Sequence, residues 1–177
     1  KNVTGMWLLQ QCKKSWATLD DREIVELAEK QPDTELYIDV DRQEFYAPRD
    51  LPDAIVNAVE EVYGAVVDRE DHGLIARIFL QSIAMKYRYY LEILSEIAGK
   101  KFNKIFILGG GSKIAFLNRI TASVCNIPVH TGIYEGSVTG NLLVQMYGCG
   151  EIESKNAMRR IVKDTFPTTI YTPIDPA

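Results

Sequence analysis

The longest regular pattern of apolar and polar positions lies near the middle of the chain. From about His72 to Ala98, apolar residues recur every three or four positions, a spacing that places them on one face of an α-helix. Asp68 and Asp71 precede the pattern, and Gly99 follows it as a stop signal. At ~1.5 Å per residue the helix would reach about 40 Å, so we expect it to be the spine of the domain. Its apolar positions are Leu74, Ile75, Ile78, Phe79, Ile83, Tyr87, Leu91, Leu94 and Ile97.

Three shorter helical patterns lie on the N-terminal side of this segment. The first is expected after Thr4, a candidate cap. The second starts at Asp20, where Glu23 stands in capping-box position, and ends before Pro32. The third starts around Pro52, because proline is favoured in a first helical turn.

Candidate strands are of two kinds. Residues 36–40 alternate over a short stretch, ahead of an expected structured loop at 39–50. Residues 104–108 contain four consecutive apolar side chains, which are typical of a parallel strand buried on both faces. A helix through Phe116 then leads to a second short strand at 128–131, so the order predicts a right-handed β-α-β unit.

The C-terminal stretch predicts two more helices and a tail. Residues 135–150 read as a helix interrupted by Gly136 and Gly140, residues 155–166 as a last helix, and residues 168–172 as β-like. A glycine inside a helix costs ~1 kcal/mol relative to alanine. Gly140 therefore suggests close helix packing or the approach of a ligand.

Composition narrows the class of protein. The 177 residues are 46% hydrophobic and 25% charged, with a net charge of −4. This balance is typical of a soluble globular domain and argues against nucleic acid as the main partner. No apolar run approaches the ~18 residues of a membrane helix, and no signal peptide is recognisable. The three cysteines are far apart, which argues against a zinc site or a disulfide framework and fits a reducing cytoplasm.

The sharpest local feature is a triple glycine, Gly109-Gly110-Gly111-Ser112, between a strand pattern and a helix pattern. Glycines let the backbone turn tightly and approach a ligand closely, and a following helix N-terminus favours phosphate. The stretch is not a P-loop, and it fails the dinucleotide pattern because Ile114 stands where a third glycine belongs. Taken alone, it is as compatible with a tight turn as with a nucleotide site.

Other candidates give no catalytic set. Glu135 and Asn141 flank the second glycine-containing motif, where a charge near a helix start is the simpler interpretation. His72 and His130 stand apart from any serine or aspartate pattern. Asp39 and Asp41 lack a third metal ligand, so we interpret them as solvated loop charges and expect no metal site. Tyr87, Tyr89 and Tyr90 are interpreted as core and flank of the long helix.

Several of these stretches together resemble rhamnulokinases, within the FGGY carbohydrate kinases and the actin/Hsp70/sugar-kinase superfamily. The resemblance runs in order over essentially all 177 residues. It rests on Lys1 through Gln10, the loop at 45–48, the stretch 77–84 on the long helix, Ile107 through Ser112, residues 116–118 and residues 135–143.

The resemblance implies the fold, the ligands and the site. The fold class would be α/β: a helix-rich, partial ribonuclease-H-like domain with a small parallel sheet, spanning 1–177 as a C-terminal nucleotide-binding domain. The reaction would be Mg²⁺-dependent transfer of the γ-phosphoryl of ATP to the 1-hydroxyl of L-rhamnulose. By position, Asn2 matches a sugar contact and Gln10 a nucleotide contact. Gly110 matches a glycine that touches the nucleotide, within the loop Gly109, Gly110, Gly111 and Ser112.

The sequence also departs from the family pattern. Family members often carry glutamate at Gln81 and a Gln-Asn pair at Lys113-Ile114, which puts contacts at those positions in doubt. The phosphate loop and the catalytic aspartate of the family's N-terminal, sugar-binding domain are not recognisable. With Lys1 in place of an initiator methionine, this suggests a fragment. We expect the chain alone to be inactive, to hold no catalytic residue, and either to self-associate through exposed sheet edges or to need the sheet's missing first strands.

Two alternatives stay open. One is another FGGY kinase, for fuculose or xylulose. The other is a non-catalytic nucleotide-binding module of the actin/Hsp70 type.

Overall fold

The computed structural model describes residues 5–174, which form seven α-helices, two short 3-10 helices and three strands. The order is α1 (Trp7–Ser15), α2 (Asp21–Lys30), η1 (Gln43–Phe45), α3 (Leu51–Tyr63), α4 (His72–Ala98), β1 (Ile105–Phe106), η2 (Gly110–Lys113), α5 (Ala115–Cys125), β2 (Val129–Thr131), α6 (Gly136–Gly148), α7 (Lys155–Thr165) and β3 (Thr169–Tyr171). None of the helices within residues 5–174 has the length and apolar character needed to cross a bilayer.

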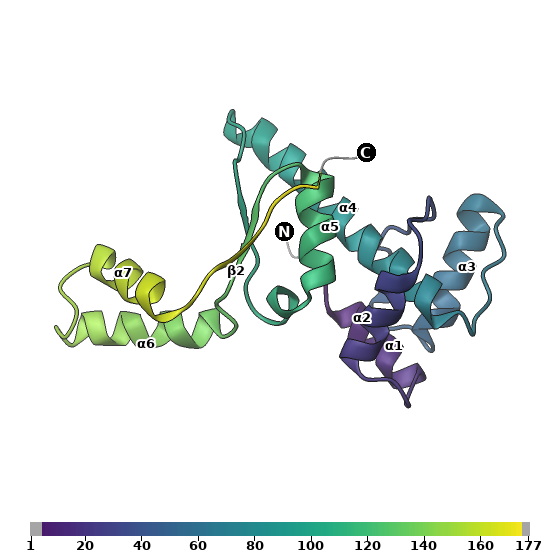
Figure 1. The fold of residues 1–177 in the computed structure, drawn as a ribbon, viewed down its shortest axis with the longest axis horizontal. Coiled ribbons are helices and arrows are strands. Elements are labelled where there is room, and N and C mark those ends of the chain that lie inside the picture. The colour runs from purple at the N-terminus through teal and green to yellow at the C-terminus, as the bar shows by residue number, and fades with distance from the viewer. Residues whose placement is uncertain (1–4, 175–177) are drawn as a thin grey trace.

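The long helix α4 is the spine, as its sequence pattern predicts. It begins after Asp71, whose carboxylate accepts a hydrogen bond from the Leu74 N–H at 2.9 Å, and it ends at Gly99 in the left-handed region (φ 60°). Its first half is buried from Ile75 to Ala84 with little interruption, and it packs mainly against α2 and α5 (Figure 1).

Local capping explains the neighbouring helices. The Asp20 carboxylate accepts from the Glu23 N–H at 2.8 Å, and the Glu23 carboxylate accepts from the Asp20 N–H at 2.7 Å, so the predicted capping box is confirmed. Asp50 caps α3, which has Pro52 in its first turn. The expected cap Thr4 lies outside the described residues.

The prediction of a strand at 36–40 is wrong. This segment is extended but pairs with no strand of the described chain, because its amides are bound by side chains of helices instead. The Ile38 N–H donates to Ser82 Oγ at 2.9 Å, and the Tyr37 N–H donates to the Tyr63 hydroxyl at 3.2 Å. Its alternation therefore records burial of Ile38 and Val40 against the helices.

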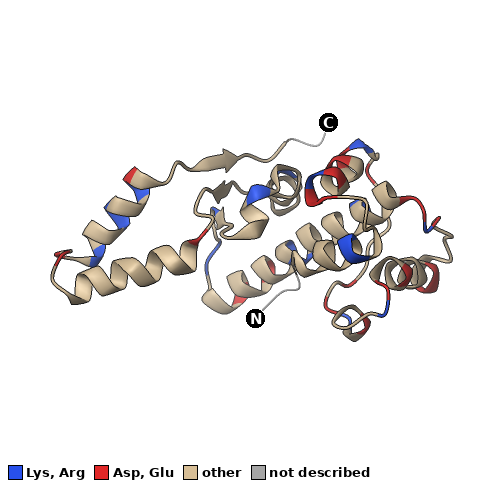
Figure 2. Ribbon diagram, turned by 90° about the horizontal axis from the view of Figure 1, so that it is seen from below, with Lys and Arg blue, Asp and Glu red and all other residues tan. Residues whose placement is uncertain are grey.

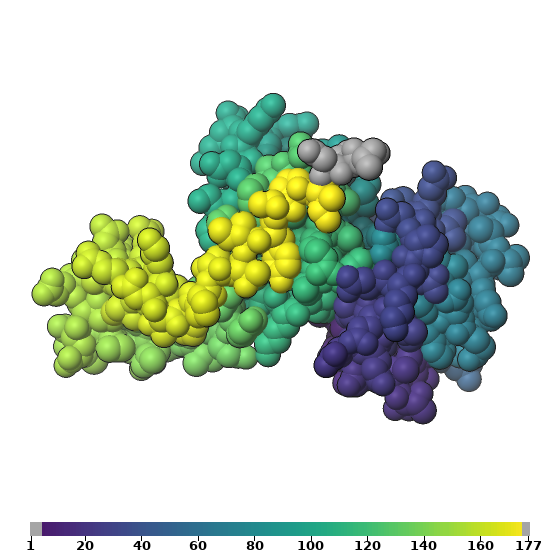
Figure 3. All heavy atoms as spheres, viewed as in Figure 1, coloured from purple at the N-terminus to yellow at the C-terminus, as the bar shows by residue number. Residues whose placement is uncertain are grey.

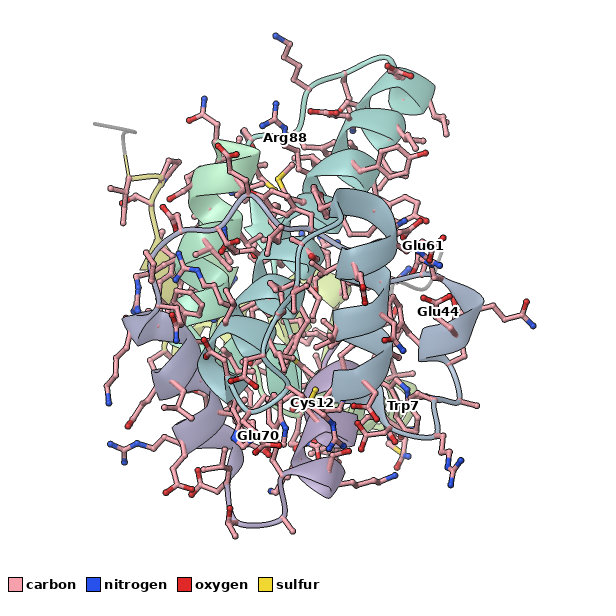
Figure 4. All side chains as sticks on the ribbon, turned by 90° about the vertical axis from the view of Figure 1, so that its right-hand side faces the viewer. Trp7, Cys12, Glu44, Glu61, Glu70 and Arg88 are labelled. Carbon is pink, nitrogen blue, oxygen red and sulfur yellow. The ribbon has the colours of Figure 1, made fainter. Side chains whose placement is uncertain are left out.

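The loop that follows is structured, as expected. Arg42 joins η1 to α3, because its guanidinium lies 3.0 Å from the Glu44 carboxylate and 2.7 Å from that of Glu61. Figure 4 shows Glu44 and Glu61 on these two neighbouring elements.

The sheet is small and mixed, and not purely parallel. β1 and β2 are parallel and are connected through α5, as predicted, but β3 returns antiparallel to β2 in the order β1-β2-β3. The expectation of a first strand buried on both faces is wrong, since Phe106 is 63% exposed. β1 lies at the edge of the sheet, which leaves this apolar run half covered.

Helices α6 and α7 form a hairpin that projects from the rest of the molecule (Figures 1 and 3). The predicted interruption of α6 is wrong, because the helix continues through Gly140, and a Cβ built there would meet no described atom within 4 Å. α6 contains no charged residue and buries only Leu143, whereas α7 carries four basic side chains (Figure 2).

Candidate functional site

A hollow of about 570 Å³ lies where α1, α2 and the start of α5 meet the triple-glycine loop. Gln10 and Gly110 both line it, although they come from distant parts of the sequence. Its apolar lining comes from Met6, Leu9 and Val25 on one side and from Ile114 and Phe116 on the other. These residues therefore offer an apolar surface beside the glycine loop.

A second hollow, of about 700 Å³, lies over the segment from Glu44 to Asn57. It is larger, but it contains none of the residues that the sequence singles out for binding. The hollow beside the glycines is therefore the candidate site.

The glycine loop has a backbone shape that requires glycine at its first position. Gly109 has φ 74° and ψ −153°, a region that other residues rarely adopt. Its N–H donates to the Ile133 carbonyl at 3.2 Å, which ties the loop to the segment after β2. A Cβ built on Gly110 would meet no described atom within 4 Å, so this glycine borders open space.

Ser112 stabilises the loop and is not among the residues that line the hollow. Its side chain is buried, and its Oγ donates to the Gly109 carbonyl at 2.5 Å. The fully buried Asn118 on α5 donates through Nδ2 to the Ser112 carbonyl at 3.0 Å. The loop is thus held from two sides.

Two amides of the loop have no hydrogen-bond acceptor among residues 5–174. No described residue accepts a hydrogen bond from the N–H of Gly110 or Gly111. Gly110 and Gly111 themselves begin the 3-10 turn η2, and α5 begins only at Ala115, so the loop does not lead directly into an α-helix as the sequence suggests. The first residues of α5, Ala115 and Phe116, still line the hollow and bring a helix N-terminus to it.

Gln10 is held by a carboxylate on the neighbouring helix. Its Nε2 donates to Asp21 Oδ2 at 3.0 Å, and Lys13 Nζ lies 3.1 Å from Asp21 Oδ1. The three side chains connect α1 to the first residue of α2.

The α2 wall of the hollow is polar and was not anticipated from the sequence. Asp21, Arg22, Val25, Glu26 and Glu29 line the hollow from this helix. Arg22 Nε pairs with Glu26 at 2.7 Å, and Arg119 of α5 pairs with Glu29. These positions recur every three or four residues on a face beside the buried Ile24 and Ala28, and that periodicity is the signal that could have grouped them.

The other candidates lie elsewhere. Asn2 is outside the described residues. Glu135 precedes α6 without capping it, and Asn141 on α6 accepts a hydrogen bond from Gln145, so neither borders the hollow. The expectation that Asp39 and Asp41 are solvated is wrong for Asp41, whose side chain is 9% exposed beside Lys86.

The two histidine rings lie against aromatic rings, and the three cysteines are free thiols. The His72 ring lies 4.6 Å from that of Trp16, and the His130 ring lies 5.2 Å from that of Phe106. Cys12 is buried, Cys125 is half-buried and Cys149 is exposed, all as free thiols. Burial raises the pKa of Cys125 to about 11, which opposes nucleophilic reactivity. No group of three or more His, Cys, Asp or Glu side chains within residues 5–174 is arranged to hold a metal ion.

Comparison with known proteins shows which family and which relatives this chain is similar to. Residues 1–149 match the C-terminal domain of the FGGY family of carbohydrate kinases. The chain is 35% identical to a rhamnulokinase of Enterococcus faecalis over 99% of its length, and 31% identical to a rhamnulokinase of Bacteroides thetaiotaomicron over all of it. In each case it spans 36% of the relative's length.

A solved structure shares the fold. The xylulose kinase from Rhodospirillum rubrum superposes with a TM-score of 0.68 at 18% identity, covering 97% of this chain and 34% of that chain. At this identity the likeness concerns the fold alone.

Proposed function

The chain belongs to the FGGY family of carbohydrate kinases, and on that premise we propose that it forms the ATP-binding side of a kinase that phosphorylates L-rhamnulose at the 1-hydroxyl. Its fold is that of the sugar-kinase superfamily, helix-rich with a small mixed sheet. The relatives at 31–35% identity are named rhamnulokinases, which favours rhamnulose over xylulose or fuculose. We treat residues 1–177 as one nucleotide-binding domain.

The observation that carries the proposal is the meeting of Gln10 and Gly110 in one hollow. In this arrangement the nucleoside of ATP or ADP occupies the apolar space between α1, α2 and α5. The phosphates lie toward Gly109, Gly110 and Gly111, where the Gly110 and Gly111 amides, which no described residue bonds, and the N-terminus of α5 favour negative charge. Ser112 stabilises the loop through the hydrogen bond from its hydroxyl to the Gly109 carbonyl.

The sugar contact, the metal ion and the catalytic residue involve fewer residues of this chain. Asn2 is proposed to contact the sugar. Mg²⁺ enters the proposal only as the companion of the nucleotide phosphates, since the described residues offer no metal cluster. We assign no catalytic residue to this stretch and propose that it is inactive by itself, in the cytoplasm where ATP and reduced cysteines coexist.

The test is a calorimetric titration with Mg-ADP of the wild-type chain and of Gly110→Val. Valine would extend into open space at the hollow, so the fold should be retained while saturable binding is lost. Gly148→Val is the matched control, because Gly148 also has open space around it but lies at the end of α6. Equal binding by wild type and Gly110→Val, or none by a folded wild type, would contradict the proposed site.

The kinase assignment is tested with a chimaera in which this chain replaces the matching stretch of the Enterococcus faecalis relative. ATP-dependent phosphorylation of L-rhamnulose should be retained, and Gly110→Val should abolish it. The chain alone, given ATP and L-rhamnulose, should show no turnover; robust turnover would refute the proposed inactivity.

A further inference from the structure

Asp21 begins α2 and also contacts two side chains of α1. It is the first residue of α2, and the capping box of Asp20 and Glu23 fixes the backbone on which it stands. One of its oxygens accepts from Gln10 Nε2 at 3.0 Å, and the other lies 3.1 Å from Lys13 Nζ. Because Gln10 and Lys13 are one turn apart on α1, Asp21 contacts both from a single position.

The chemistry of this contact determines which way the Gln10 amide faces. A carboxylate only accepts hydrogen bonds, whereas a glutamine amide carries a donor end and an acceptor end. The NH₂ group must therefore face Asp21. Gln10 Oε1 remains, and no described residue donates a hydrogen bond to it. Gln10 thus offers the hollow an acceptor.

The surrounding charge indicates which part of a ligand meets this acceptor. The carboxylates of the α2 wall are already paired: Asp21 lies beside Lys13, Glu26 beside Arg22 and Glu29 beside Arg119. Since the cations of this wall are taken up by carboxylates, phosphate is better placed at the glycine loop, where Gly110 and Lys113 line the hollow. Gln10 therefore meets the nucleoside end of a ligand.

We propose that Asp21 is a positioning residue that orients the Gln10 amide as a hydrogen-bond acceptor, so that the hollow selects nucleosides with a donor at that edge. The donor is either the exocyclic amino group of adenine or a ribose hydroxyl. This inference rests on the proposed nucleotide site and adds the means by which that site discriminates among nucleotides.

The experiment measures the affinity of the chain for Mg-ADP and for three analogues that each lack one donor: the diphosphates of inosine, 2′-deoxyadenosine and 3′-deoxyadenosine. Wild type should bind one of them about tenfold more weakly than ADP, the effect of one lost hydrogen bond in a desolvated site. That analogue identifies the donor. In Asp21→Asn the Gln10 amide can turn either way, and the preference should fall to about twofold or less.

Three variants separate orientation from charge and from stability. Glu26→Gln removes a carboxylate from the same wall without a contact to Gln10, so it should shift all four affinities alike. Asp21→Glu keeps an acceptor-only group and should retain much of the preference. Gln10→Ala should abolish it, and adding Asp21→Asn to Gln10→Ala should change it no further. If Asp21→Asn does not fold, Asp21→Ser provides the same readout.

The outcomes are distinguishable. An undiminished preference in folded Asp21→Asn overturns the role of Asp21, while binding that still depends on Gly110 leaves the nucleotide site standing. Equal wild-type affinity for ADP and all three analogues overturns the inference in the same way. Absence of saturable binding by the folded wild type overturns both.

Discussion

Lys86 on the long helix α4 binds the irregular segment that contains Asp39 and Asp41. Its Nζ lies 2.6 Å from Asp39 Oδ1 and 3.4 Å from Asp41 Oδ2, and 5.5 and 5.6 Å from the ring centroids of Tyr89 and Tyr90. Burial alone would lower the pKa of Lys86, but the two carboxylates outweigh it and raise that pKa. Burial likewise opposes the charge of Asp39, yet the hydrogen bond from Lys86 leaves the pKa of Asp39 below its usual value.

Lys86→Met should lower the free energy of unfolding by about 2 kcal/mol at pH 7, because two carboxylates lose a charged donor. The Asp39 contribution is present above the ordinary aspartate pKa and is lost as pH falls through the lowered value. Urea denaturation near pH 7 and near pH 2 should therefore show the two proteins converging in acid. Lys86 has a raised pKa, so its contribution is complete below 10.5 and is lost only as pH rises beyond that.

The control for this prediction is Arg88→Met, since Arg88 pairs with Glu92 on the exposed face of the same helix. It should change stability by less than about 0.5 kcal/mol. An equal loss for Lys86→Met at both pH values would contradict the electrostatic account.

At the scale of elements, the connection between the sheet and the α6–α7 hairpin depends on one glycine. Gly132 directly follows β2 and has φ 138°, and a Cβ there would lie 2.3 Å from the Pro167 carbonyl oxygen just before β3. The two chain segments that lead into and out of the hairpin therefore pass too closely for any side chain at this position.

Gly132→Ala should destabilise the β2–β3 pairing by about 1–3 kcal/mol, because the backbone must move to admit the methyl group. Amide hydrogen exchange should speed up in α6, α7 and β3 while the core around α4 stays protected. Gly140→Ala is the matched control: its methyl meets open space within α6 and should stabilise that helix by up to about 1 kcal/mol. Unchanged amide hydrogen exchange in Gly132→Ala would show that the close approach of the two backbone segments does not affect stability.

At the scale of the whole molecule, β1 and α6 both present exposed apolar side chains. Phe106 is 63% exposed, Val138 65% and Leu142 56%, and β1 leaves one sheet edge unpaired among the described strands. Figure 3 shows the hairpin standing away from the body of the protein. Exposed apolar surface next to an open strand edge favours association with another chain.

We therefore expect self-association, measured by light scattering as an average mass that rises above 20.0 kDa with concentration. Val138→Lys combined with Leu142→Lys should shift this toward the monomer, since both side chains lie one turn apart on α6. Ile97→Lys, on a residue 78% exposed at the end of α4, controls for added charge. A monodisperse 20.0 kDa species at all concentrations would refute the expectation.

The sequence by itself determined the helices that have local signals, and it identified the family. Asp71 with Gly99, and Asp20 with Glu23, delimit helices through hydrogen bonds that span only a few residues, so their meaning does not depend on the rest of the fold. The family resemblance alone singles out Gln10, whereas Gly110 also stands out as part of the triple glycine.

Only the tertiary structure decided what depends on distant partners. The extended segment 36–40 has the alternation of a strand, but its hydrogen-bond partners are Ser82 and Tyr63 on two helices. β3 runs antiparallel because the α6–α7 hairpin returns it beside β2, which no local pattern encodes. The α2 wall of the hollow, with Asp21 against Gln10, likewise exists only because packing brings α1, α2 and the glycine loop together, since side-chain periodicity identifies a face but not what it meets.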